Sequence, residues 1–189
     1  MPALDGLRVA VLAADGFEER ELVEPVRALR AAGARVEIVA PHEGELQGMR
    51  LENQAGRATV DRAIHAASAE DYDALLLPGG ALSADSLRMR AEVQAFVRAV
   101  HHAGKPIAAI GHAPWLLVST GLVPDRALTS HFSIQDDVRN AGGTWLDRAV
   151  VAEGTWITSR DEYDLPAFIE ATIALFARAR RDRSIPHSA

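Results

Sequence analysis

Gly111, His112, Ala113 and Pro114 stand between an apolar run and an expected helix. A strand that passes directly into a helix forms a sharp elbow, whose apex usually holds a nucleophile above the sheet and near backbone N–H donors. The apex residue here is Gly111, which has no side chain, and His112 follows it. Because an imidazole exchanges protons near neutral pH, the segment predicts acid–base chemistry rather than nucleophilic attack.

Two further segments follow expected strands, at residues 15–18 and 78–80. In open parallel sheets, ligands bind outside the carboxyl ends of the strands, so these segments and the elbow are expected to meet. Glu18 in the first segment could serve as a carboxylate partner of His112, or it could only mark the acidic start of a helix. The sequence contains no GxGxxG or GxxxxGK[ST] pattern, so no phosphate loop is predicted.

Apolar runs alternate with helical patterns along the chain, which predicts an α/β fold with a mostly parallel sheet and helices on both faces. A pair of strands is expected to turn at Glu153-Gly154. Segment 41–69 is expected to be a loop with one or two short edge strands. The core strands are expected at 7–13, 35–40, 74–77 and 107–110. The helices are expected at 18–32, from 83 or 85 to 103, and at 114–120, 133–141 and 165–179.

Composition limits the function classes. A chain of 189 residues fits one domain, expected over 1–180 with a frayed tail at 181–189. A net charge of −6 argues against non-specific nucleic-acid binding. No apolar window is long enough for a membrane span, and the first residues do not resemble a signal peptide, so a cytoplasmic protein is expected. With 0 cysteines, the chain cannot form disulfides, thiolate metal sites or a cysteine nucleophile.

Several separate motifs resemble the ThiJ/PfpI superfamily, which includes PfpI-like intracellular proteases and deglycases. The resemblance implies a flavodoxin-like three-layer α/β/α sandwich, related to class I glutamine amidotransferases, and a homodimer with its site near the interface. The family reads A-I-C-H-G-P at the elbow, where this chain has Ala109-Ile110-Gly111-His112-Ala113-Pro114. The other matching segments are 15–25, 72–80, 129–145 and 158–168.

The resemblance also implies roles for single residues. Glu18 matches a carboxylate that contacts the cysteine, and His112 matches the family's histidine. Asp85 aligns with a carboxylate from the partner subunit that orients this histidine, although it could equally cap a helix. Backbone N–H groups of Gly80 and His112 would stabilise an oxyanion.

Three positions depart from the family pattern. Gly111 replaces the cysteine, Ala113 replaces the glycine after the histidine, and His131 stands where a tyrosine usually borders the site. A natural loss of the thiol fits these departures better than an engineered one, because a deliberate replacement usually changes a single position. Substrate-binding roles are expected for Gly111, Gly80, His131 and Ala113.

Without a thiol, the family's covalent protease, deglycase and glyoxalase chemistry is not expected. One hypothesis is an enzyme that uses acid–base chemistry on a small carbonyl-bearing molecule, with His112, Glu18 and Asp85 as catalytic residues and no cofactor. The other is an inactive stress-response or ligand-binding homologue. Glu18, His112 and His131 could also form a two-histidine, one-carboxylate metal site, but their spacing is not diagnostic and no metal is predicted.

Overall fold

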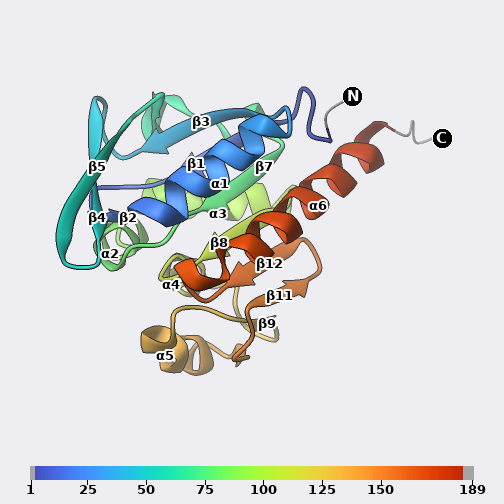
Figure 1. The fold of residues 1–189 in the computed structure, drawn as a ribbon. Coiled ribbons are helices and arrows are strands. Elements are labelled where there is room, and N and C mark those ends of the chain that lie inside the picture. Colours follow the sequence, from blue (N-terminus) through green and yellow to red (C-terminus); the bar gives the residue numbers. More distant parts are fainter. Residues whose placement is uncertain (1–2, 185–189) are drawn as a thin grey trace.

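A central sheet of seven strands runs through the computed structural model, which describes residues 3–184 (Figure 1). The strand order is β11-β12-β8-β7-β1-β3-β6, and all neighbours pair in parallel except β11 with β12. The strands are β1 (Arg8–Leu12), β3 (Arg35–Ala40), β6 (Arg62–Ala63), β7 (Ala74–Leu77), β8 (Ile107–Ile110), β11 (Val150–Glu153) and β12 (Trp156–Ser159).

Helices cover both faces of this sheet and make three layers (Figure 1). On one face lie α1 (Glu19–Ala31) and α6 (Leu165–Ser184). On the other lie α2 (Ala81–Arg88), α3 (Ala91–His102) and α4 (Pro114–Ser119), with α5 (Gln135–Asn140) packed beside α4. The predicted flavodoxin-like sandwich is therefore confirmed.

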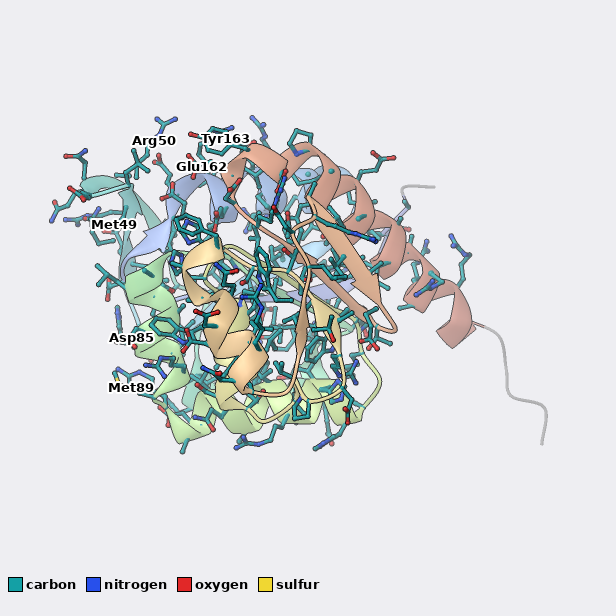
Figure 2. The ribbon with its side chains drawn as sticks, turned by 90° about the horizontal axis from the view of Figure 1, so that it is seen from below. Met49, Arg50, Asp85, Met89, Glu162 and Tyr163 are labelled. Atoms are coloured by element: carbon teal, nitrogen blue, oxygen red, sulfur yellow. The ribbon has the colours of Figure 1, made fainter. Side chains whose placement is uncertain are left out.

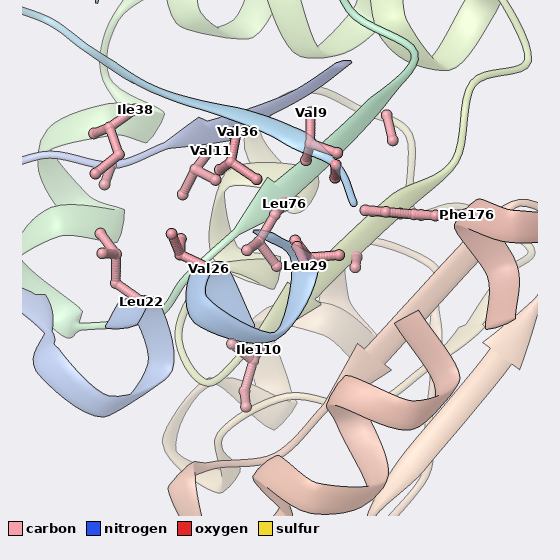
Figure 3. Close-up of a cluster of buried hydrophobic side chains, with 14 of the residues drawn as sticks. Val9, Val11, Leu22, Val26, Leu29, Val36, Ile38, Leu76, Ile110 and Phe176 are labelled. Atoms are coloured by element: carbon pink, nitrogen blue, oxygen red, sulfur yellow. The ribbon is translucent and has the colours of Figure 1, made fainter. Parts of the chain in front are cut away.

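Alternation along the central strands divides the core into two apolar clusters. Val9 and Val11 of β1 face the α1 side, whereas Ala10 and Leu12 face the α3 side. Figure 3 shows the first cluster, in which one stripe of α1 meets the sheet and Phe176 of α6. This packing fixes the position of α1, whose first turn carries Glu21 and whose N-cap residue is Glu18.

Two smaller sheets lie beside the central one. Segment 41–69, expected as a loop with short edge strands, contains the hairpin β4 (Glu45–Arg50) and β5 (Asn53–Thr59), and β4 also pairs with β2 (Phe17–Glu18). The other small sheet joins β9 (Ala127–Leu128) to β10 (Thr144–Trp145).

Two helix predictions need correction. The helix expected to run unbroken to 103 is two helices, α2 and α3, because Arg90 has extended backbone between them (φ −97°, ψ 119°). No glycine or proline marks this break, so the sequence pattern does not reveal it. The last helix continues to Ser184, beyond the predicted end at Ala179, and the remainder of the expected tail, 185–189, lies outside the described residues. None of the described helices is long and apolar enough to cross a membrane.

Candidate active site

The elbow after β8 has the backbone shape that its glycine allows. Gly111 has φ +66°, in the left-handed region that favours glycine, and Pro114 begins α4 three residues later. The N–H of Gly111 donates to the carbonyl of Ser159, and its own carbonyl accepts from the N–H of His131. The elbow is thus held between β12 and the segment that follows β9.

Gly80 lies against the end of the first crossover. It has φ +104°, and a Cβ there would collide with the backbone of Gly16, Phe17 and Glu18. The N–H of Glu18 donates to the carbonyl of Gly79 at 3.0 Å. This close approach of the two backbone segments requires glycine at position 80. It brings Glu18 beside the end of β7, as expected because sites in parallel sheets form at the carboxyl ends of the strands.

A cavity of about 360 Å³ lies where these segments meet. It is lined by residues from six parts of the chain, and four of the lining residues are acids. The lining residues are Gly16, Glu18, Glu21, Met49, Leu51, Gly80, Ala81, Leu82, His112, His131, Phe132, Asp161, Glu162 and Tyr163.

Glu21 of α1 is the carboxyl group nearest the elbow apex. Its Oε2 lies 2.5 Å from the position that a Cβ on Gly111 would take, so the carboxyl group occupies space that a side chain at the apex would need. The residue is 4% exposed, and Oε2 makes no hydrogen bond of good geometry with the described residues, although it lies against Gly79, whose backbone N–H lowers the pKa of Glu21. Burial, with Glu18 and Glu162 nearby, raises the pKa of Glu21 to about 8, so the group is mainly a neutral acid at pH 7.

Glu18, the predicted carboxylate, lies one turn before Glu21 and lines the same cavity. Its Oε2 accepts from the backbone N–H of Leu51 at 3.3 Å, while its Oε1 is buried without a partner in the part of the chain that the structure describes. Burial and the charge of Glu162 raise the pKa of Glu18 above its usual value. Two carboxyl groups therefore face one cavity, each with one unpaired oxygen.

His112 does not make the contact with Glu18 that the sequence predicted. Its Nε2 lies 3.0 Å from Ser133 Oγ, and its ring stacks on His131 with centroids 4.3 Å apart. His131 Nδ1 accepts from the N–H of Ser133 at 3.3 Å and lies 2.8 Å from its hydroxyl oxygen. These bonds assign the protons: Ser133 donates to His131, and His112 donates from Nε2 to Ser133, which leaves Nδ1 of His112 as the unprotonated nitrogen.

Both imidazoles are held neutral. Burial and the neighbouring His131 lower the pKa of His112 to about 4. Burial also lowers the pKa of His131, against the opposing charges of Asp161 and Glu162. An uncharged His112 can accept a proton or polarise a substrate without first losing one.

An NMR titration of the imidazole protons tests this state directly. We expect His112 to remain neutral down to about pH 4, because its charged form is buried beside a second imidazole. His42 serves as an internal control, since the backbone of Glu43 and the carboxylate of Asp15 raise its pKa. Titration of His112 at or above the ordinary value of about 6.5 would contradict the assigned environment.

The structure brings some of the predicted residues together and leaves others apart. Glu18, Gly80, His112 and His131 line one cavity, and Gly111 adjoins it. Ala113 is 4% exposed and packs in the apolar cluster around α3 and α4, so it does not reach the cavity.

Asp85 also lies apart from the cavity lining. It pairs with Arg88 at 2.9 Å on α2. Figure 2 places Asp85 and Met89 away from Glu162 and Tyr163. A role for Asp85 in the site of a partner subunit stays a prediction.

Sequence reasoning missed Glu21, Ser133 and the acids of the 3₁₀ turn η4 (Glu162–Asp164), with Asp161 just before it. Glu21 could have been found by its spacing, because it lies three residues after Glu18 and one turn before the buried Pro25. Asp161 and Glu162 follow the carboxyl end of β12, which is parallel to β8. Within residues 3–184, no group of three or more histidine, aspartate and glutamate side chains is arranged to hold a metal ion.

A doubly wound α/β sandwich with its site at a strand-to-helix elbow defines the class of this protein. Residues 7–175 match the DJ-1/PfpI family, and the chain belongs to it. The predicted ThiJ/PfpI membership is therefore confirmed, with Gly111 at the position of the family's cysteine.

Relatives and a solved structure agree with this assignment. The chain is 34% identical to Deglycase TK1284 of Thermococcus kodakarensis over 89% of this chain and 99% of the relative. It is 33% identical to General stress protein 18 of Bacillus subtilis over 92% of this chain and 99% of that protein. The structure of Schizosaccharomyces pombe DJ-1 superposes with a TM-score of 0.79 over 95% of this chain and 100% of the other, and at 24% identity it supports the fold alone.

Proposed function

We propose that this protein is a cysteine-independent acid–base enzyme acting on a small carbonyl-bearing molecule, by proton transfer, hydration, dehydration or ring closure. One observation carries the proposal: Glu18 and Glu21 line one cavity at the elbow, and each has a buried carboxyl oxygen without a partner among the described residues. An unpaired buried carboxyl oxygen costs free energy unless a ligand completes its hydrogen bonds. Two such residues lining one cavity support a binding site for a polar molecule.

The two carboxyl groups are suited to different roles. Glu21, with a pKa of about 8, would donate a hydrogen bond from its protonated oxygen to a carbonyl oxygen placed at the elbow. Glu18 would remove a proton from the neighbouring carbon, and its raised pKa makes it a better base than an exposed carboxylate. Pairs of acids whose environments differ in this way commonly divide the acid and base roles.

His112 would move the proton between positions on the substrate. Its neutral imidazole has an unprotonated Nδ1, because Nε2 is bonded to Ser133. The backbone N–H groups of Gly80 and His112 are proposed to add further donors to a developing oxyanion. A cytoplasmic homodimer, with Asp85 of one subunit near the site of the other, belongs to the same proposal.

Exchange of substrate protons into D₂O tests the proposal without knowledge of the product. Short aldehydes and ketones, including hydroxyacetone, are incubated with the protein, and loss of the C–H signals next to the carbonyl is followed by NMR. We expect Glu18→Gln, Glu21→Gln and His112→Asn each to slow the exchange by roughly 10²- to 10⁴-fold, the usual contribution of a positioned acid or base. Glu170→Gln, on the exposed face of α6, is the matched control.

The alternative is a homologue that binds a ligand or acts in stress response without catalysis. It is favoured by the absence of the family's cysteine and by the name of the Bacillus subtilis relative, General stress protein 18. Exchange no faster than in buffer for every compound, or equal exchange in all three variants, would support this alternative and contradict the enzyme.

A further inference from the structure

The mouth of the cavity carries a second set of acids that the proposed chemistry does not use. Asp161 and Glu162 line it from the segment after β12, and both are partly exposed. Their charges act on the interior of the cavity, because Glu162 raises the pKa of both Glu18 and Glu21, and Asp161 raises that of Glu21. These acids therefore favour a positive over a negative charge on a molecule bound in the cavity.

The described residues that line the cavity include no arginine or lysine that would offset these acids. Arg50, the last residue of β4, acts on Glu18 with the opposite charge and lowers its pKa. Arg20 is engaged by Glu24 at 2.8 Å. The two lining imidazoles, His112 and His131, have lowered pKa values and add no charge at neutral pH.

Aromatic side chains complete the mouth. Phe132 and Tyr163 line it and are 66% and 83% exposed, an uncommon state for such large rings. The face of an aromatic ring attracts a cation, by about 0.5–1 kcal/mol at an exposed site. Acids and rings around one opening provide the two features that recognise an organic ammonium group.

We infer that the molecule this cavity accepts carries a positive charge, as an amine or quaternary ammonium group held at Asp161, Glu162 and the two rings, while its polar end reaches Glu21. The inner end of the site rests on an independent observation, since Glu21 is almost fully buried, lines the cavity and has an Oε2 unpaired within the described chain. The inference deepens the proposed function, on which it rests, by assigning the substrate class: a small carbonyl compound with an ammonium group.

Three probes with one carbon skeleton isolate the effect of charge: 1-amino-2-propanol is a cation, propane-1,2-diol is neutral and lactate is an anion. Each is titrated into the full chain while the His112 and His131 signals are followed by NMR. We expect the amine to bind at least roughly tenfold more tightly than the diol, equivalent to about 1.4 kcal/mol, and lactate to bind weakest. Raising the salt concentration is expected to weaken amine binding, because the acids at the mouth are partly exposed.

Charge-removing variants identify the residues responsible. Glu162→Gln and Asp161→Asn are expected to reduce amine binding several-fold and to leave diol binding unchanged, and Asn can still accept the cap bond from the N–H of Tyr163. Glu170→Gln, which removes the same charge on α6 outside the cavity, is expected to change neither. Equal binding of the three probes, tighter lactate binding, no binding by the amine, or an amine preference that persists in both variants would overturn the inference. The probes have no ketone or aldehyde group and do not react, so failure of the proposed chemistry would appear only in the D₂O exchange.

Discussion

Gly111→Ala is expected to lower the free energy of unfolding by about 2–4 kcal/mol, measured by urea denaturation near pH 6. Two costs add. A non-glycine residue at a φ of +66° costs on the order of 1 kcal/mol or more. The new Cβ would also lie 2.5 Å and 3.0 Å from the two carboxyl oxygens of Glu21, so a buried acid must move.

Gly104 provides a control with the same backbone strain and no neighbour. Its φ is +67°, and no described atom lies within 4 Å of the Cβ position. Gly104→Ala therefore measures the conformational cost alone, and the excess in Gly111→Ala measures the contact with Glu21. Combining Gly111→Ala with Glu21→Ala should remove most of that excess. Equal losses for Gly104→Ala and Gly111→Ala would show that Glu21 does not occupy the apex.

In this site the carboxyl group of Glu21, rather than a cysteine thiol, lies beside the elbow apex. The nearer carboxyl oxygen of Glu21 lies 2.5 Å from the position that an apex Cβ would take, so Gly111 and Glu21 fit each other sterically. Position 111 cannot regain a thiol without displacing a buried acid. Gly111 thus leaves the space beside the elbow to a carboxyl group instead of a thiol, as the proposed acid–base function requires.

Raising the pH from 5 to 8 is expected to destabilise the protein through Glu21. The folded-state pKa of about 8 lies above the unfolded value of 4.5, so the folded state retains a proton that the unfolded state has lost between these values. The contribution of this proton to stability is fully present below pH 4.5 and is lost as pH rises through about 8. The expected slope is about 1.4 kcal/mol per pH unit inside this window.

Glu21→Gln isolates this contribution, because an amide resembles the neutral acid in shape and does not ionise. The difference in unfolding free energy between the parent protein and this variant should change by roughly 2–3 kcal/mol between pH 5.5 and 7.5. Taking the difference cancels the pH dependence of groups that do not interact with Glu21, such as His42. Glu170→Gln should follow the parent at every pH. Parallel curves for the parent and Glu21→Gln would mean that Glu21 is ionised in the folded protein.

The fold was largely predictable because local patterns and global packing agree. Continuous apolar runs at the central strands indicate burial on both faces, and the glycine-rich ends indicate where the chain turns. The elbow at Gly111 was predictable for the same reason, since a strand meets a helix there without a linker. The break at Arg90 was not predictable, because no glycine or proline marks it in the sequence.

The candidate site was predicted less completely. Glu21 stands among several acids at a helix start, where the helix dipole alone explains acidic residues, and only the packing of α1 shows that this one is buried. Asp161 and Glu162 follow a strand whose direction the sequence did not fix. Ser133 turns His112 away from Glu18 through a bond that no spacing rule anticipates.

The hairpin of β4 and β5 has a consequence for how relatives of this protein diversify. It contributes Met49 and Leu51 to the cavity wall, and its tip at residues 51–52 lies outside the seven-stranded sheet. Leu46 and Ala58, farther from the tip, belong to the first apolar cluster. Insertions or replacements at its tip can therefore reshape the opening while both apolar clusters keep their residues. Changes confined to this tip can alter which molecules enter without replacing Glu18 or Glu21.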